Sequence, residues 1–161
     1  MGWNQGTVLT KKLQSRIFYS DQMSDLVAYV DGSCLGSPGQ AGIGIIIRGW
    51  KEEPIRVAKW IGHQDNNVAE YVALLEALQC ALRLSAAALH VYSDSEVVVK
   101  QMKGAYICRS SRLYSLNWVC RKLARSLAFS ISHIPRQINT EANALAHSAV
   151  RKRLRPIEAP A

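Results

Sequence analysis

Three short, β-branched segments near the start of the chain constrain the fold more than any other feature of the sequence. They span 26–30, 41–48 and 55–61, and each is bounded by Gly, Pro or charged residues. Runs of this kind predict strands, and three in succession with short connections predict an antiparallel meander. The chain therefore begins as a sheet that later elements must cover.

The rest of the chain alternates between helical and strand patterns. The predicted elements are a helix over 65–85, a strand over 89–93, a short helix ending at Gly104, a helix over 109–127, a strand over 129–134 and a helix over 139–154. Asp65 is an Asx cap for the first helix, and the S-x-x-E box from Ser93 to Glu96 starts the second. This order predicts one α/β unit with a five-stranded mixed sheet, three antiparallel strands and then two parallel ones, flanked by helices.

The length of 161 residues suits a single domain. We predict that this domain spans 25–154, with an N-terminal extension over 1–24 and a tail over 155–161. No apolar run is long enough to cross a membrane and the start of the chain lacks a secretion-signal pattern, so we expect a cytoplasmic protein. The cysteines form no CxxC pair, which predicts reduced thiols rather than a zinc site. We expect a monomer without an obligate protein partner.

Positive charge is concentrated in one stretch. The net charge is +8, and no Asp or Glu occurs over 97–140, where eight basic residues lie: Lys100, Lys103, Arg109, Arg112, Arg121, Lys122, Arg125 and Arg136. A face with no acids among its bases attracts a polyanion, although a solvated helix face is the usual role of such a run. Tyr114 and Trp118 lie among these bases, where aromatics are more often core than a stacking surface.

Three acidic residues stand at positions where chemistry is expected. Asp31 and Asp94 each follow an apolar strand directly, although each would also serve as an ordinary turn or cap residue. Glu70 is harder to explain structurally, because Ala73 and Leu74 place it on the apolar side of its helix and no Lys or Arg lies within helical reach. A buried glutamate needs a partner, and a cation is the natural one.

These three carboxylates are predicted to converge from two strand ends and a facing helix. A cluster of negative charge of this kind is stabilised by divalent ions. Oxygen ligands alone favour the hard cations Mg²⁺ or Mn²⁺ over zinc. Such a site is suited to phosphoryl transfer assisted by two metal ions.

Four ordered segments, which together extend over most of 26–150, resemble the type 1 ribonuclease H family. They are YVDGSCLGSPGQAGIGI over 29–45, NNVAEYVALLEAL over 66–78, YSDSEVVVKQMKG over 92–104 and HIPRQINTEANALA over 133–146. The resemblance implies the ribonuclease H fold and an endonuclease that hydrolyses the RNA strand of RNA/DNA hybrids, leaving 5′-phosphate and 3′-hydroxyl ends. Because the span from 94 to 143 is too short for the basic handle of some members, the chain resembles the handle-less, archaeal-like branch.

The metal ligands that the resemblance implies are Asp, Glu, Asp and Asp. The first three fall on Asp31, Glu70 and Asp94, and the fourth falls on Asn143, where the family motif A-D-x-L-A reads ANALA. The resemblance implies two Mg²⁺ or Mn²⁺ ions. An amide oxygen brings no negative charge, so the second ion is expected to be held more weakly.

The resemblance also implies roles in proton transfer and substrate binding. Either His133 or Arg136 would assist proton transfer or product release, and His133 also fits a strand-end histidine without chemistry. Contacts with the RNA/DNA hybrid would come from Gly32, Ser33, Cys34, Ser37, Asn66, Asn67 and Glu96.

Two other interpretations are open at this stage. Recombinases of the same superfamily place their glutamate on a late helix, whereas Glu70 precedes Asp94, which argues against that group. A catalytically weakened module that binds hybrids or double-stranded RNA is the second alternative, and Asn143 supports it.

Overall fold

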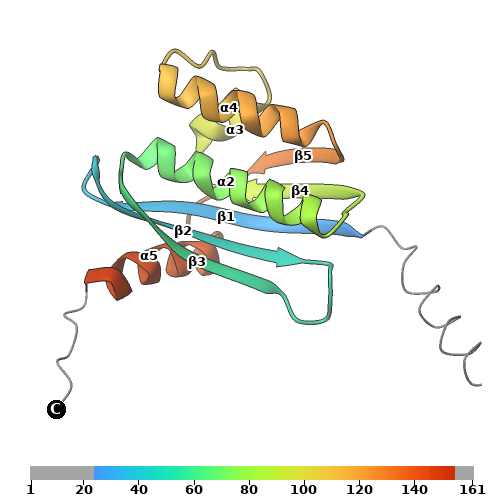
Figure 1. Ribbon diagram of the computed structural model, residues 1–161, viewed down its shortest axis with the longest axis horizontal. Helices are drawn as coiled ribbons and strands as arrows, with labels where there is room; N and C mark the ends of the chain where they lie inside the picture. The colour runs from blue at the N-terminus through green and yellow to red at the C-terminus, as the bar shows by residue number, and fades with distance from the viewer. Residues whose placement is uncertain (1–23, 155–161) are drawn as a thin grey trace, which may run out of the picture.

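A computed structural model describes residues 24–154 (Figure 1). The predicted tail over 155–161 and the predicted extension over 1–24, except for its last residue, lie outside the described residues. Nine elements follow one another: β1 (Asp25–Leu35), β2 (Gly39–Arg48), β3 (Ile55–Gln64), α2 (Asn66–Arg83), β4 (Ala88–Ser93), α3 (Glu96–Met102), α4 (Ser111–Ala124), β5 (Ala128–His133) and α5 (Thr140–Leu154).

The five strands form one mixed sheet in the order β3-β2-β1-β4-β5. β1 pairs antiparallel with β2, and β2 pairs antiparallel with β3, as short connections allow. β4 lies parallel to β1 and β5 lies parallel to β4, because a helical crossover precedes each of them. The predicted sheet is therefore confirmed, with β1 at its centre.

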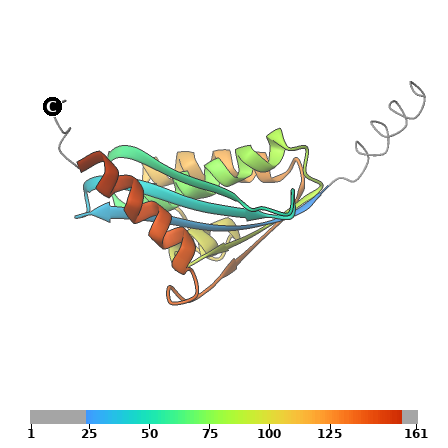
Figure 2. The same cartoon turned by 90° about the horizontal axis from the view of Figure 1, so that it is seen from below.

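Helices cover the two faces of the sheet unequally (Figures 1 and 2). α2, α3 and α4 lie on one face, and α5 crosses the other face, where it packs against β1, β2 and β3. The main core lies between α2 and the sheet, and its largest buried side chains include Leu26, Ile43, Ile45, Tyr71, Leu74, Leu78 and Leu89. Asp65 starts α2 as predicted, because its side chain accepts a hydrogen bond from the Val68 amide at 2.8 Å.

Two glycines of β2 bring α5 against the sheet. A Cβ atom on Gly44 would lie 2.0 Å from the Ala142 carbonyl oxygen, and one on Gly42 would lie 2.5 Å from that of Ala146. No side chain fits in either gap. The glycines therefore let the backbone of α5 lie directly on β2, and alanines on α5 face them across the contact.

Some details differ from the sequence prediction. β1 does not end before Asp31 but continues along β2 to Leu35. The short helix α3 is capped by Ser95, whose Oγ accepts from the Val98 amide, while Ser93 is the last residue of β4. The predicted capping box is thus wrong by two positions, because the strand pairing with β5 holds Ser93 in extended backbone.

The two aromatics of α4 are not core residues. Tyr114 is 58% exposed and Trp118 is 53% exposed, because α4 turns a different side, with Asn117 and Cys120, toward the core. None of the helices between residues 24 and 154 is both long and apolar enough to cross a membrane.

Candidate active site

Two carboxylates stand where β4 leaves the sheet. The parallel pairing of β1 with β4 ends at Val30 and Ser93, whereas β1 continues along β2. Asp31 is therefore the first β1 residue without a β4 neighbour, and Asp94 is the first residue after β4. Asp31 is only 2% exposed. Both side chains therefore start at the point where β4 stops pairing with β1.

The third carboxylate comes from α2. Glu70 is 5% exposed, and its Oε2 accepts a hydrogen bond from the Gly32 amide at 3.1 Å. A Cβ atom on Gly32 would lie 2.4 Å from the Glu70 amide nitrogen, so the first turns of α2 pack on β1 only because residue 32 is glycine. The glycine after Asp31 thus has a definite structural role, which is to bring Glu70 to the strand.

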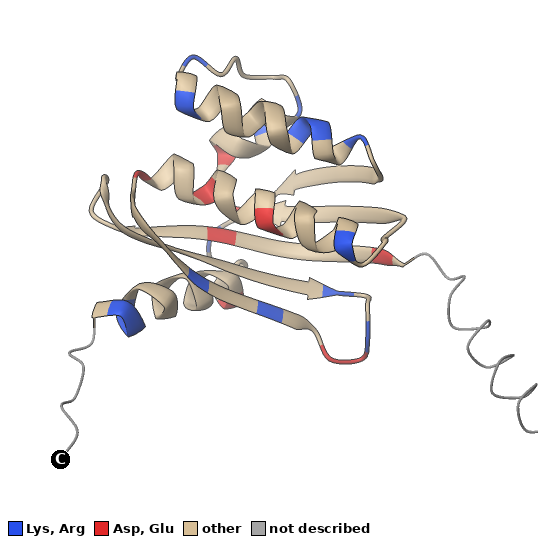
Figure 3. Ribbon diagram, viewed as in Figure 1, with Lys and Arg blue, Asp and Glu red and all other residues tan. Residues whose placement is uncertain are grey.

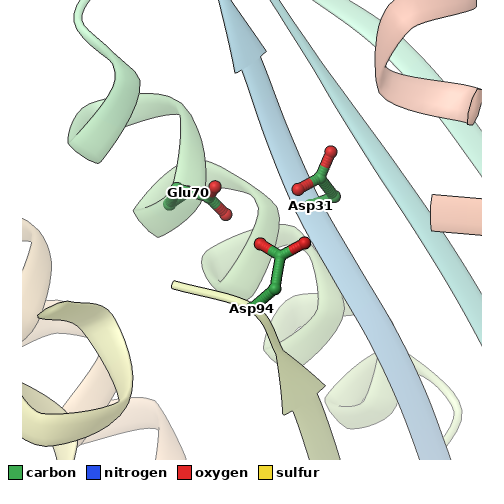
Figure 4. A group of neighbouring side chains, drawn as sticks. All are labelled: Asp31, Glu70 and Asp94. Carbon is green, nitrogen blue, oxygen red and sulfur yellow. The ribbon is translucent and has the colours of Figure 1, made fainter. Parts of the chain in front are cut away.

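The predicted convergence is present in the structure. Asp31, Glu70 and Asp94 each offer an oxygen within 4.8 Å of the others, and the three side chains point toward one another (Figure 4). Burial, followed by repulsion from Asp94, raises the pKa of Asp31 to about 7. Burial, followed by Asp31 and then Asp94, raises the pKa of Glu70 well above its usual value. Both pKa values are raised because the acids are buried close together without enough positive charge beside them.

The donor set fits a hard divalent cation. Asp94 Oδ2 is buried and has no hydrogen-bond partner among the described residues. An orphaned carboxylate oxygen is costly unless a cation meets it, and this one lies in a cluster of oxygens only. We therefore regard Asp31, Glu70 and Asp94 as the residues that would hold metal.

Asn143 reaches the same cluster from α5. Its Nδ2 donates a hydrogen bond to Asp31 Oδ2 at 3.0 Å. In this orientation the amide nitrogen faces the carboxylate. To offer its oxygen to an ion shared with Asp31, the amide must turn by half a rotation, which exchanges its oxygen and nitrogen.

The structure separates the two candidates for proton transfer. Arg136 lines the pocket of about 140 Å³ that holds the three carboxylates, and its positive charge lowers the pKa of Asp31 and of Glu70 against the stronger effects of burial and repulsion. His133 ends β5 outside this lining, and its exposed ring lies 3.3 Å from the carbonyl oxygen of Asp94. Of the two candidates, Arg136 is therefore the one that lines the carboxylate pocket.

The predicted substrate residues are divided in the same way. Gly32, Ser33, Cys34 and Asn66 line the carboxylate pocket, whereas Ser37, Asn67 and Glu96 do not. Ser37 Oγ instead accepts from the Asn66 amide at 3.2 Å, and Glu96 pairs with Lys100 one turn along α3.

One pocket residue was missed by the sequence prediction. His147 lines the pocket, and its Nδ1 lies 3.3 Å from Ser33 Oγ. Burial, and then Arg136 and Arg151, lower the pKa of His147, which favours its neutral form. Its position four residues after Asn143 on a helix was the available signal, because such residues share a face.

The fold and the acidic cluster together define a class. A sheet in this strand order, with carboxylates from β1, from α2 and from the residue after β4, is the ribonuclease H-like arrangement expected from the sequence.

Comparisons with known proteins agree. Residues 29–149 match the family model described as reverse transcriptase-like. A ribonuclease HI of Halobacterium salinarum is 34% identical over 125 residues, which are 76% of this chain and 63% of that protein. The crystal structure of RNase H1 from the same archaeon superposes with a TM-score of 0.76 at 32% identity, covering 80% of this chain and 98% of that one. LC11-RNase H1, solved in complex with an RNA/DNA hybrid, gives a TM-score of 0.75 at 32% identity over 81% of this chain and all of that one.

The chain therefore belongs to the type 1 ribonuclease H family, within the reverse transcriptase-like group. It spans less than two thirds of the length of the curated relatives it matches, 63% of the Halobacterium protein and 35% of a bifunctional protein of Mycobacterium tuberculosis.

Proposed function

We propose that this chain is an endonuclease that hydrolyses the RNA strand of RNA/DNA hybrids with the help of two Mg²⁺ or Mn²⁺ ions. The observation that carries the proposal is the meeting of three carboxylates within 4.8 Å in a fold of this family. The buried, unpartnered Asp94 Oδ2 adds to it, since a cation is the partner it lacks.

Asp31 lies between the other groups and is the residue that would contact both ions. Glu70 and Asp94 would complete one ion site, and Asn143 with Asp31 the other. When bound, the two divalent ions would activate a water molecule and stabilise the leaving 3′ oxygen of the phosphodiester. Attack of this water on the phosphorus, with departure of the 3′ oxygen, would leave a 5′-phosphate and a 3′-hydroxyl.

The chain's own groups supply orientation and charge around that centre. The buried Gly32 amide holds one oxygen of Glu70, and before an ion binds the Asn143 amide nitrogen holds one oxygen of Asp31. Arg136, on the loop before α5, brings a positive charge to the pocket rim, where it can meet a phosphate oxygen and assist product release.

Two further surfaces support binding of the hybrid. Ser33, Cys34 and Asn66 present small polar groups beside the carboxylates, which suits recognition of ribose 2′-hydroxyls rather than of base sequence. The exposed bases of the stretch over 97–140, which contains no Asp or Glu, supply positive charge for the phosphate backbone. LC11-RNase H1, which is similar over its whole length, was solved with such a hybrid.

A second candidate is a catalytically weakened module that binds hybrids or double-stranded RNA. The neutral Asn143, with its amide nitrogen on Asp31, is the observation that favours it. The two candidates share the binding surface and differ only in whether the second ion is held well enough for chemistry.

A cleavage assay separates them. The full chain is incubated with an end-labelled RNA/DNA hybrid at increasing Mg²⁺ or Mn²⁺, with EDTA as one control and RNA/RNA and DNA/DNA duplexes of the same sequence as others. We expect metal-dependent cuts in the RNA strand of the hybrid alone, with 5′-phosphate ends. Binding of the hybrid without cleavage at saturating Mn²⁺ would support the second candidate instead.

A further inference from the structure

Three polar contacts spaced four residues apart hold α5 against β1. Asn139, just before the helix, donates to the Val30 carbonyl oxygen at 2.8 Å. Asn143 donates to Asp31 at 3.0 Å, and His147 Nδ1 lies 3.3 Å from Ser33 Oγ. For the last two contacts the spacing is matched by geometry, since the four helical residues from Asn143 to His147 rise about 6 Å and the two strand residues from Asp31 to Ser33 about 6.7 Å.

These contacts give α5 a register that its apolar contacts do not. Gly42 and Gly44 allow the helix to lie close to β2, but small residues in contact leave it able to slide or roll, because apolar contact is non-directional. Asn139 and His147 fix the helix on either side of Asn143. Of the three contacts, the one between His147 and Ser33 has both partners in the pocket lining.

The identity of residue 143 makes this register important. A carboxylate at that position would be drawn to a metal ion by its charge. A neutral amide is attracted to the ion much more weakly, so its place beside Asp31 depends more on the surrounding protein. Ser33 is 5% exposed and has no other side-chain partner among the described residues, so removing the imidazole leaves a buried hydroxyl unsatisfied.

We propose that His147 is a positioning residue: through Ser33 it holds α5 in the register that keeps the Asn143 side chain beside Asp31, where its amide can turn to an ion, and thereby sets the affinity of the second ion site. The effect of His147 on catalysis rests on the proposed function, whereas its effect on the position of Asn143 does not. In this role His147 acts through Ser33 and does not itself contact the carboxylates or the reacting atoms.

The test uses variants of the full chain without substrate. His147→Leu removes the hydrogen bond, His147→Gln keeps a side chain able to bond to Ser33, and Ser33→Ala removes the other partner. His90→Leu is the matched control, because His90 also pairs with a serine, Ser130, but on β4 and β5 outside the pocket. Asn143→Ala provides the background in which nothing is left to position.

Two readouts are followed at a temperature where every variant is folded. The first is the affinity of the weaker Mn²⁺ site by calorimetry or electron paramagnetic resonance. The second is the NMR signal of the Asn143 side-chain amide in the metal-free protein, identified by its loss in Asn143→Ala.

We expect His147→Leu and Ser33→Ala to weaken the second site about three- to tenfold, the loss of one hydrogen bond, and to shift the Asn143 signal. His147→Gln is expected to restore most of both, and His90→Leu to change neither. In the Asn143→Ala background, His147→Leu is expected to add no further loss.

The proposal is overturned if His147→Leu leaves the Asn143 signal unchanged, or if its effect on Mn²⁺ is equally large without Asn143. Should His147→Leu not fold, Ser33→Ala decides by the same two readings. A wild-type chain that binds no second ion, or does not cut the hybrid, contradicts the proposed function, while the Asn143 signal still decides the positioning role.

Discussion

The carboxylate pocket and α4 carry opposite charge, and they are built in opposite ways. Figure 3 shows acidic positions on β1 and α2 and basic positions along α4. The pocket draws one acid each from β1, α2 and the end of β4, and Asp31 and Glu70 are buried. The bases on and beside α4, here called the α4 face, come from one continuous stretch and are exposed. They are Arg109, Arg112, Arg121, Lys122 and Arg125. Its described ion pairing is a single contact of 3.7 Å between Arg112 and Asp65.

The two regions are expected to respond differently to substitution. Buried groups that meet from distant elements act through their geometry, so the loss of one is expected to disable the site. Exposed charges on one helix act through their sum, so each contributes a little and none is essential.

The largest effect is expected at the centre of the pocket. Asp31→Asn removes the carboxylate that both ions would share, and we expect the rate of hybrid cleavage to fall more than about a hundredfold, the scale of losing one electrostatic contact to a transition state. Single-turnover cleavage at saturating metal measures this, with circular dichroism as the control for folding. Cleavage near the wild-type rate would show that the active site lies elsewhere.

A smaller effect needs several changes on the α4 face. Replacing Arg109, Arg112, Arg121 and Lys122 together with Gln should weaken hybrid binding about ten- to a hundredfold near physiological salt and lower the salt slope by about 3. Arg112 should contribute least, because Asp65 already pairs with it. A titration of affinity against salt measures the slope.

The control for this variant lies on other surfaces. Lys51→Gln with Arg83→Gln lowers the net charge without touching α4 and should leave the slope nearly unchanged. An unchanged slope in the fourfold α4 variant would mean that this face does not meet nucleic acid.

Asn143→Asp tests the neutral side chain that lies beside the three carboxylates. The fourth carboxylate should tighten the second ion about tenfold, equivalent to ~1.4 kcal/mol, so that cleavage at low Mg²⁺ rises and the optimum moves to lower metal. The gain at saturating metal should be smaller. Parallel Mg²⁺ and Mn²⁺ titrations of both proteins measure the shift. Identical metal dependence would show that residue 143 is not a ligand.

The smallest effect concerns stability without metal. The pKa of Asp31 is raised to about 7, so in EDTA the folded state loses stability as pH rises from near 4 and the loss is complete above about pH 7. Asp31→Asn should therefore raise the melting temperature more at pH 8 than at pH 5, by about 2–4 °C for each kcal/mol of repulsion removed. Arg121→Gln on α4 should leave it unchanged at both. A lower melting temperature for Asp31→Asn at pH 8 would contradict the repulsion.

The fold was predictable because each element has a strong local signal. The β-branched runs gave the strands, Asp65 gave the start of α2, and short connections gave the antiparallel half of the sheet. Where a local signal competed with pairing, pairing prevailed. Ser93 has the sequence of a helix cap, yet it stays in β4 because β5 pairs with it.

The site was predictable in part. The apolar neighbours of Glu70 indicated that it faces inward, and the structure brings it to Asp31 and Asp94. His133 and Arg136 could not be distinguished from the sequence, because both lie near the same loop and only the path of the backbone separates them. His147 was missed because its partner, Ser33, lies 114 residues away.

The contact between Asn143 and Asp31 joins residues 112 apart in the chain. Closing a loop of that length comes late in folding, since the entropy of closure must be overcome before non-local contacts stabilise the structure. The meander and α2 contain Asp31 and Glu70, whereas α5 is synthesised after every other described element. A nascent chain that ends before α5 lacks the polar contacts that complete the pocket. The second ion site should therefore be among the last features to form during refolding, and its appearance would mark the docking of α5.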